Sequence, residues 1–135
     1  SILIALAVEI CNPSVHSIVE LQTPENIHHA KNAGVDEVII SSSYQGSILA
    51  QSASSPGVSR VFSEIFGQTS TVVRQEEASS ELVGKSYAEV STWYTNENIG
   101  SLLGIIRDTE AILVPNANLK LEKSDKLVVL TRAKN

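Results

Sequence analysis

The pattern of apolar and polar positions predicts alternating helices and strands in the first half of the chain. Residues 2–11 are almost entirely apolar and rich in Leu and Ala, which favour helix. Because Pro13 disfavours helical geometry at Asn12, we expect a buried helix that ends there. Residues 15–21 form a short apolar segment typical of a strand, and residues 35–40 predict a second strand.

The segment between these two strands carries strong helix signals. Thr23 is a candidate N-cap, Pro24 fits the first helical position and Glu25 complements the positive end of a helix. Gly34 suits a left-handed cap at the carboxyl end. About fifteen residues separate the strands, which is enough for a parallel crossover, and we expect that crossover to be right-handed.

Two more helices are predicted after the second strand. Residues 41–43 are three serines, which we interpret as a polar turn before a helix over residues 44–53. The Ser-Ser-Pro-Gly sequence of residues 54–57 breaks that helix. The next helix ends at Gly67 and has apolar residues at i, i+3, i+4 and i+7, which form one stripe: Val58, Val61, Phe62 and Ile65.

Beyond Gly67 the pattern changes to short strands around one helix. Ser86 and Glu89 form an S-x-x-E capping box, which begins a helix that continues to about Tyr94. The expected strands cover residues 71–74, 102–106, 111–114 and 127–131. We therefore expect two domains, residues 1–67 with parallel α/β character and residues 68–135 as a small α+β lobe.

Composition narrows the classes of partner. The net charge of −5, with Lys and Arg scattered, argues against nucleic acid as a partner. The longest apolar run, residues 2–8, is far shorter than the ~20 residues of a membrane helix, so we expect any membrane attachment to lie outside this chain. The single cysteine, Cys11, fits a reducing compartment.

The sequence contains no motif that indicates catalysis. Gly-x-Gly occurs nowhere, so a dinucleotide fingerprint is excluded. The three serines at residues 41–43 lack the G-x-S-x-G context of a nucleophile elbow, and no Ser-His-acid or Cys-His grouping has a supporting local pattern. We expect a regulatory or assembly protein and not an enzyme.

Several segments, in their order and spacing, resemble one known family. Residues 24–39, PENIHHAKNAGVDEVI, resemble the late half of the RCK (regulator of potassium conductance, TrkA-N) domain. Residues 82–86, 103–107 and 119–130 resemble the TrkA-C domain that follows it. The resemblance covers nearly the whole chain. It implies an α/β fold class, with the C-terminal half of a Rossmann-like parallel sheet followed by a small α+β TrkA-C lobe.

The chain departs from the family pattern in two places. An RCK N-lobe normally begins with a strand, a Gly-rich turn and a helix, whereas this chain begins at a helix late in that lobe, so it resembles a fragment. Many relatives also have Pro-Gly before the residue that matches Asp125, where this chain has Lys123-Ser124. The turn there is expected to differ.

Ligands of open α/β sheets bind beyond the carboxyl ends of the strands. The two strand ends here offer Glu20 and Gln22, and Ser41 and Ser42, and backbone N–H groups of the following helix favour an anion or polar ligand. In calcium-gated relatives a carboxylate at the position of Glu20 binds the ion with an acid two residues later, which here is the neutral Gln22. Glu20 is therefore a candidate calcium ligand, and a solvated or nucleotide-facing Glu20 is the alternative.

The helices between the lobes are candidates for self-association. In relatives these helices pack against a partner subunit, so the resemblance implies an interface through the apolar stripe, and packing within its own lobe is the alternative. The candidate interface residues are Ile48 and Leu49 of the first helix, with Val58, Val61, Phe62 and Ile65 of the second.

The resemblance implies a cytoplasmic regulatory module that senses a ligand and gates a potassium channel or potassium-uptake system of the inner membrane. Its partners would be a second copy in a homodimer, an octameric ring and a membrane pore or transporter subunit. The ligand would be a nucleotide (NAD, ATP or ADP), calcium or a cyclic dinucleotide, and the sequence does not choose among them. The alternatives are the regulatory lobe of a cation–proton antiporter, a ligand-free dimerisation module and a dehydrogenase fragment.

Overall fold

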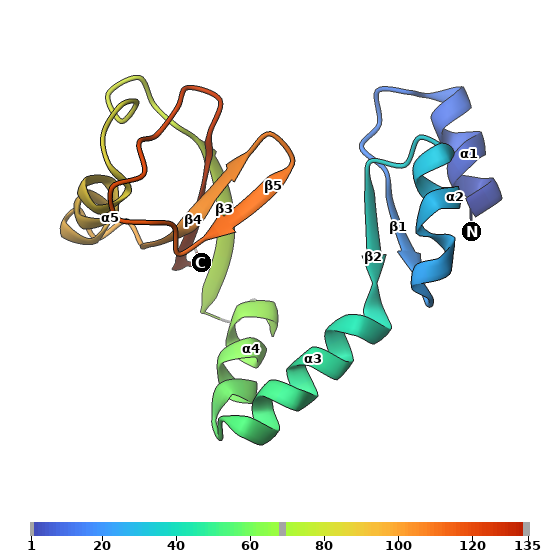
Figure 1. Cartoon of the computed structure of the whole chain (residues 1–135), viewed down its shortest axis with the longest axis horizontal. Helices are drawn as coiled ribbons and strands as arrows, with labels where there is room; N and C mark the ends of the chain where they lie inside the picture. The colour runs from blue at the N-terminus through green and yellow to red at the C-terminus, as the bar shows by residue number, and fades with distance from the viewer. Residues whose placement is uncertain (1, 68–69, 134–135) are drawn as a thin grey trace. The chain divides into compact units, whose positions relative to one another are not determined.

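The computed structural model describes residues 2–67 and 70–133. The chain divides into two compact units, Ser1–Ser59 and Arg60–Asn135 (Figure 1). The division falls within helix α4 (Val58–Gly67), whereas the sequence analysis placed the domain boundary at the end of that helix.

The first unit contains a two-stranded parallel sheet with helices around it. Strands β1 and β2 pair in parallel from Ile18 opposite Glu37 to Leu21 opposite Ile40, as expected. The buried cluster consists mainly of small residues: Ala5, Val19, Leu21, Ala30, Ala33 and Val35. The elements are α1 (Ile2–Cys11), β1 (Ile18–Leu21), η1 (Pro24–Asn26), α2 (Ile27–Asn32), β2 (Glu37–Ile40) and α3 (Ser41–Ser54).

The helical segment between β1 and β2 begins differently from the prediction and ends as predicted. It starts with a 3-10 turn, η1, before α2. Thr23 has the extended backbone of an N-cap, but its side chain makes no capping hydrogen bond. Gly34 has a φ of 87°, so it supplies the left-handed conformation that ends the segment.

Two expectations for the first unit were wrong in part. The helix over residues 2–11 is present, but only Ala5 is buried, because the small core accepts one face of α1; Leu3, Ile4 and Ile10 are 81%, 71% and 74% exposed. The serines at residues 41–43 do not form a turn. Helix α3 begins at Ser41, directly after the extended residue Ile40.

The second unit is built on a four-stranded antiparallel sheet of order β3-β6-β4-β5. Strand β3 continues to Glu77, beyond the predicted end at Arg74, because all seven of its residues pair with β6. Together with the parallel sheet of the first unit, this confirms the predicted α/β fold class. The elements after α4 are β3 (Thr71–Glu77), α5 (Tyr87–Asn96), β4 (Ser101–Arg107), β5 (Glu110–Leu113) and β6 (Lys126–Arg132).

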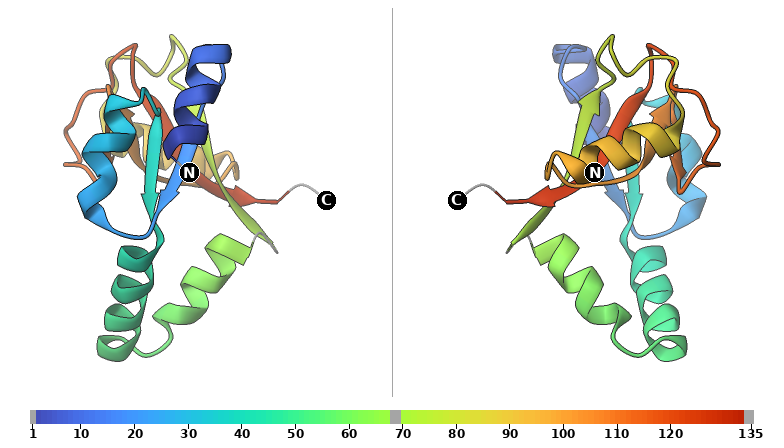
Figure 2. Two further views of the ribbon diagram at one scale, coloured as in Figure 1. Left: turned by 90° about the vertical axis from the view of Figure 1, so that its right-hand side faces the viewer. Right: turned by 90° about the vertical axis from the view of Figure 1, so that its left-hand side faces the viewer.

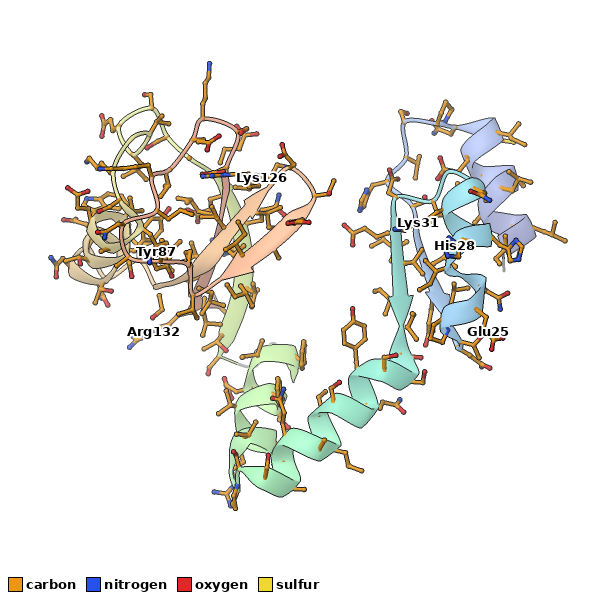
Figure 3. All side chains as sticks on the ribbon, viewed as in Figure 1. Glu25, His28, Lys31, Tyr87, Lys126 and Arg132 are labelled. Carbon is orange, nitrogen blue, oxygen red and sulfur yellow. The ribbon has the colours of Figure 1, made fainter. Side chains whose placement is uncertain are left out.

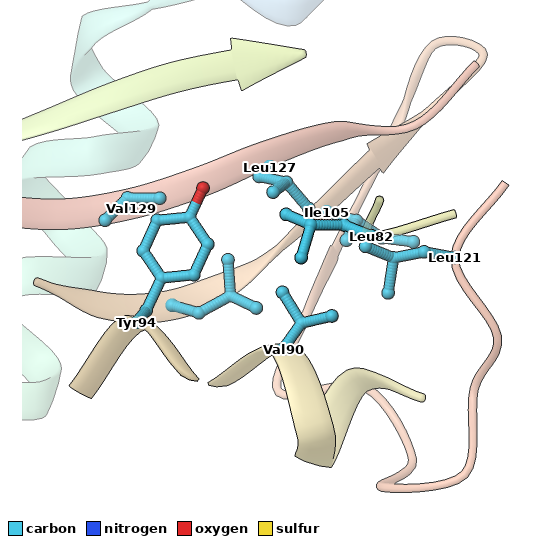
Figure 4. Packing of buried hydrophobic residues seen from close by; sticks show 8 residues of the cluster. Leu82, Val90, Tyr94, Ile105, Leu121, Leu127 and Val129 are labelled. Atoms are coloured by element: carbon cyan, nitrogen blue, oxygen red, sulfur yellow. The ribbon is translucent and has the colours of Figure 1, made fainter. Parts of the chain in front are cut away.

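Helix α5 covers one face of this sheet (Figure 2). Its predicted capping box is present: the Ser86 hydroxyl accepts from the Glu89 backbone N–H, and the Glu89 carboxylate accepts from the Ser86 backbone N–H. The Tyr87 hydroxyl donates to the Leu102 carbonyl at 2.7 Å and ties the helix to β4. The core between them is shown in Figure 4 and consists of Leu82, Val90, Tyr94, Leu102, Ile105, Leu121, Leu127 and Val129.

Close backbone approach explains the glycine of β4. The register between β4 and β6 shifts between Leu102 and Gly104. A Cβ at Gly104 would lie against the Ile112 carbonyl oxygen and 2.8 Å from the Leu113 Cα. Only glycine fits there without a shift of the backbone of β5.

Candidate functional site

The carboxyl ends of β1 and β2 lie side by side, because the parallel register ends with Leu21 opposite Ile40. The Ser42 hydroxyl donates to the backbone carbonyl of Gln22 at 2.9 Å, so the residues that follow the two strands are in contact. Gln22 and Ser42 are exposed and Ser41 is half-buried. We call this region, Gln22 with Ser41 and Ser42, the strand-end edge.

Helix α3 presents its N-terminus at the strand-end edge. Its N-cap residue, Ile40, offers no side-chain hydrogen bond, and the first turn contains no acidic residue. The first backbone N–H groups of a helix have no partner within the helix and attract negative charge. The edge therefore combines serine hydroxyls, a carbonyl and helix N–H groups, a set that suits an anion or a polar ligand.

Glu20 precedes the strand-end edge on β1 and lines a different part of the surface. Leu21 is buried, whereas Glu20 is exposed on the opposite face, with Ile39 as its neighbour in β2. Glu20 lines a groove of about 510 Å³ between α1 and β1, whose lining includes Ile4, Val8 and Ile18 but not Gln22 or the two serines. The sequence predicted these four residues as ligand-binding residues at the ends of the two strands. The structure brings Gln22 and Ser42 together and gives Glu20 a different lining.

No metal centre is evident around Glu20. In the part of the chain that the structure describes, no group of three or more His, Cys, Asp or Glu residues is placed to hold a metal ion. Calcium usually takes six to eight oxygen ligands, so Glu20 alone is far from a complete site. Its role as a calcium ligand stays a prediction.

Charge in the first unit is strongly one-sided. Residues 1–59 contain five acids, Glu9, Glu20, Glu25, Asp36 and Glu37, and a single Lys, Lys31. Lys31 and His28 project from α2, and Glu25 lies in η1 (Figure 3). A phosphate ligand at the strand-end edge would thus depend on backbone N–H groups, because basic side chains are scarce in this unit.

The helix residues chosen as interface candidates are exposed to different degrees. Leu49 of α3 is 76% exposed and Ile48 is half-buried. On α4, Val61 is 57% exposed, whereas Val58, Phe62 and Ile65 are half-buried. The Phe62 ring stacks on that of Phe66, with centroids 6.0 Å apart.

Two apolar surfaces escaped the sequence analysis. Phe66, the continuation of the α4 stripe, is 68% exposed. Helix α1 is apolar on nearly all sides and was expected to be buried, so its exposed residues were not considered as a contact surface. A helix that is apolar all round is normally covered, which makes α1 a second candidate for contact with another protein surface.

The best-connected polar group in the second unit joins Arg107 to Asp125. The Arg107 Nε and Nη2 atoms donate to the two Asp125 carboxylate oxygens, both at 2.8 Å. Nη2 also donates to the Lys120 carbonyl, and Nη1 pairs with Glu122 at 2.7 Å. Asp125 is 1% exposed, and the hydrogen bonds from the Arg107 side chain hold the pKa of its carboxyl below the usual value.

This group shapes the turn before β6 and is structural. The Glu122 backbone N–H donates to the Asp125 carboxylate at 2.8 Å, so the turn closes without the Pro-Gly that the resemblance had led us to compare. Sequence reasoning named Asp125 only as part of that turn. Its partner is eighteen residues away, on β4, and no local pattern indicates the pairing.

Tyr94 is a second buried titratable group of this unit. Its hydroxyl donates to the Glu76 carboxylate of β3 at 3.0 Å. Burial, reinforced by this hydrogen bond, raises the pKa of Tyr94 to about 12. The tyrosine therefore stays protonated and links α5 to β3.

Comparison with known proteins identifies the fold. No protein-family model and no curated protein matches the sequence. Among solved structures, 96% of the chain matches the structure of the human SLO3 gating ring with a TM-score of 0.74 at 14% identity. The chain has an RCK-type fold.

Other RCK-type structures match less well. The GsuK channel bound to NAD gives a TM-score of 0.46 at 19% identity, and the GsuK RCK domain gives 0.44 at 20% identity, each over 96% of this chain. This chain spans 28% of the SLO3 chain and 23% and 27% of the two GsuK chains. The helices that the structure describes include none long and apolar enough to cross a membrane.

Proposed function

We propose that this chain is a regulatory, ligand-sensing module of a potassium channel or a potassium-uptake system. The observation that carries the proposal is the match of 96% of the chain to the human SLO3 gating ring, with a TM-score of 0.74. The module would act on the cytoplasmic side, attached to an inner-membrane transport protein whose membrane-spanning part lies outside this sequence. It would be a regulator and not an enzyme.

In this proposal a ligand biases the arrangement of the two units. A ligand shifts a conformational equilibrium only by its differential affinity for the two states, and about 5.5 kcal/mol is needed to invert a 1:99 population. Several copies acting together supply that preference more easily than one. The division of the chain into two compact units is compatible with such a mechanism.

The ligand site that we favour is the strand-end edge. Contact between Ser42 and Gln22 and the uncapped N-terminus of α3 support a nucleotide there. A neighbour in structure is a GsuK channel bound to NAD, which makes NAD the first nucleotide to test. Calcium at Glu20 and a cyclic dinucleotide at a groove between two C-lobes are the other ligands that we would test.

Self-association is the second part of the proposal. The exposed apolar residues of α1 and α4 are surfaces that another subunit would cover, in a homodimer or in a larger ring. The same lobes on a cation–proton antiporter, or a dimerisation module that binds no ligand, remain the alternatives. A change in thermal stability on addition of a ligand would distinguish a ligand-sensing module from a dimerisation module that binds no ligand.

The test is a thermal-shift and calorimetric titration of the whole chain with NAD, ATP, ADP, cyclic dinucleotides and Ca²⁺. A nucleotide at 100 times its Kd stabilises the folded chain by about 2.7 kcal/mol. Ser42→Ala should weaken nucleotide binding several-fold. Ser47→Ala is the matched control, because the Ser47 hydroxyl makes a similar 2.9 Å bond to the Ser43 carbonyl within α3.

The calcium reading has its own pair of variants. If Glu20 holds the ion, Glu20→Gln abolishes the response to Ca²⁺, whereas Glu25→Gln, another exposed acid of the same unit, preserves it. A chain that self-associates but responds to no compound in the panel would support the dimerisation module and refute ligand sensing. A chain that stays monomeric at all concentrations would count against the gating reading as well.

A further inference from the structure

Strand β3 forms one edge of the antiparallel sheet in the second unit. It is bonded to β6 on one side, and within residues 70–133 no strand pairs with its other side. All seven residues from Thr71 to Glu77 pair with β6 in an unbroken register, so the edge is long and regular. Such an edge is a template for pairing with another strand.

The hydrogen-bond pattern shows which backbone groups face outward. The Ala133 N–H donates to the Ser70 carbonyl at 2.9 Å, and the Ala78 N–H donates to the Asp125 carbonyl at 3.2 Å. Because antiparallel pairs alternate between bonded and non-bonded positions, the even-numbered residues of β3 bond to β6. The odd-numbered residues Val73, Gln75 and Glu77 therefore direct their N–H and C=O groups away from the sheet.

The edge lacks three of the usual protections against pairing, which are proline, lysine and a bulge. Its sequence, TVVRQEE, has no Pro or Lys, and the β3–β6 register contains no bulge. Its charged side chains are of both signs: Arg74 and Glu77 are exposed and Glu76 is half-buried. Arg74 makes no hydrogen bond or ion pair with the residues that the structure describes. The guanidinium is thus available to a carboxylate from another chain.

Charge complementarity selects one register for a second copy. With a two-fold axis at Gln75, Arg74 lies directly opposite Glu76 of the second copy, twice across the axis. An axis at Arg74 would place two arginines opposite each other, and an axis at Glu76 two glutamates, which is unfavourable. Arg74 and Glu76 both lie on the α5 face of the sheet, because their partners in β6 are the buried residues Val129 and Leu127.

We propose that two copies of this chain join their β3 strands antiparallel, about a two-fold axis at Gln75, into one continuous eight-stranded sheet. The outward groups of Val73, Gln75 and Glu77 then form about six interchain backbone hydrogen bonds, two per bonded pair. The Arg74–Glu76 pairs occupy non-bonded positions, where side chains approach most closely. The Tyr94 hydroxyl bonds one oxygen of Glu76, which leaves the other oxygen for Arg74 of the second copy.

This contact is separate from the apolar surfaces of α1 and α4. It uses backbone groups and charges of a sheet edge, and it makes no use of the apolar stripe. Two independent contacts on one chain would allow assemblies larger than a dimer.

Cysteine cross-linking of the whole chain tests the register directly. In a Cys11→Ser background, Gln75→Cys places two thiols at the axis with Cα atoms about 5.5 Å apart, within the range of a disulfide. Val73→Cys is the matched control, because its two copies would be four residues out of register, about 13 Å apart. We expect Gln75→Cys to form disulfide dimers at least about tenfold faster than Val73→Cys on mild oxidation. Equal rates would overturn the proposal.

Charge variants test the pairing of Arg74 with Glu76. In the Gln75→Cys background, Arg74→Glu and Glu76→Lys each put like charges opposite each other and should slow cross-linking. A mixture of the two variants restores an attractive pair at both positions, so heterodimers should form faster than either homodimer. Thermal unfolding checks that each variant folds. If Glu76→Lys does not fold, because it loses Tyr94, unchanged cross-linking of Arg74→Glu would still refute the charge pairing.

Discussion

Gly104 is a position at which the fold has no room for a side chain. A methyl group there would press on the backbone of β5, next to Ile112 and Leu113, and backbone cannot rotate away as a side chain can. The residue is also part of a Gly-x-x-x-Gly spacing with Gly100, a pattern known from membrane helices. In this fold the two glycines serve strand packing, because a Cβ on Gly100 would lie 2.5 Å from the Leu130 carbonyl oxygen.

We expect Gly104→Ala to destabilise the chain by about 2 kcal/mol or more, as overpacking in a core does. Gly46→Ala is the control: a Cβ there meets nothing within 4 Å, and the position lies inside α3. Alanine should therefore stabilise that helix by about 0.5–1 kcal/mol. Urea denaturation measures both, and equal effects of the two substitutions would contradict the close approach at Gly104.

Asp125 should give the chain an acid-sensitive component of stability. Its pKa is lowered in the folded state, so its contribution to stability is present above the ordinary value of 3.8 and is lost as pH falls below it. Asp125→Asn should cost about 3 kcal/mol at neutral pH, because it leaves Arg107 without its charged partner.

That difference between Asp125→Asn and the parent chain should shrink as the pH is lowered through the range below 3.8. Denaturation curves recorded from pH 7 to pH 2 measure it. Asp108→Asn, an exposed position in the adjacent turn, is the control and should change little. A difference that stayed constant with pH would mean that the carboxylate charge is not what stabilises the turn.

At the scale of elements, some local signals predicted the structure correctly, whereas the exposure of α1 and the start of α3 were not predicted. The capping box of Ser86 and Glu89 and the terminating Gly34 are short-range features, and both appear as expected. The burial of α1 was wrong, because it depends on how much core the unit offers and not on the helix itself. The start of α3 was missed because serines are good turn residues, and nothing local shows that β2 leads directly into a helix.

The candidate site was likewise predicted only in part from the sequence. The parallel order of β1 and β2 was enough to predict that Gln22 and Ser42 follow neighbouring strand ends. The 2.9 Å hydrogen bond from the Ser42 hydroxyl to the Gln22 carbonyl places them in contact. Glu20 was predicted with them because it lies at the end of the same strand, but in the structure it lines a groove with Ile4, Val8 and Ile18 that includes neither Gln22 nor Ser42. The Arg107–Asp125 pair joins segments that are distant in the sequence, so no periodicity or motif predicted it.

Helix α4 gives a test of association at this scale. Val61 is 57% exposed on the apolar stripe, so Val61→Glu should weaken self-association about tenfold if the stripe is an interface. Ser63→Glu adds the same charge to an exposed residue off the stripe and should leave association unchanged. Sedimentation at several concentrations measures both. Equal behaviour of the two variants would show that α4 packs within its own unit.

Over the whole molecule, the two units have cores of different quality. The first contains three alanines among its six buried apolar residues, whereas the second encloses leucines, valines, an isoleucine and a tyrosine. Large side chains contribute about 1.5–3 kcal/mol each on burial, and alanine contributes much less. We expect the first unit to open more readily than the second.

Hydrogen exchange followed by mass spectrometry should therefore show faster exchange in residues 18–40 than in residues 101–132. Asp125→Asn should speed exchange in the second unit and leave the first unchanged. Equal protection of both units in the parent chain would indicate that they unfold together, which would count against independent cores.

The guanidinium of Arg107 has a consequence for how this sequence is able to vary. From the end of β4, this one planar group bonds the Lys120 carbonyl and the carboxylates of Glu122 and Asp125. A lysine carries the same charge, but its compact ammonium group lacks the planar fork that bonds both oxygens of Asp125 while also bonding Lys120 and Glu122. Residues 107 and 125 should therefore change together in evolution. Homologues in which only one of the two is replaced should be rare.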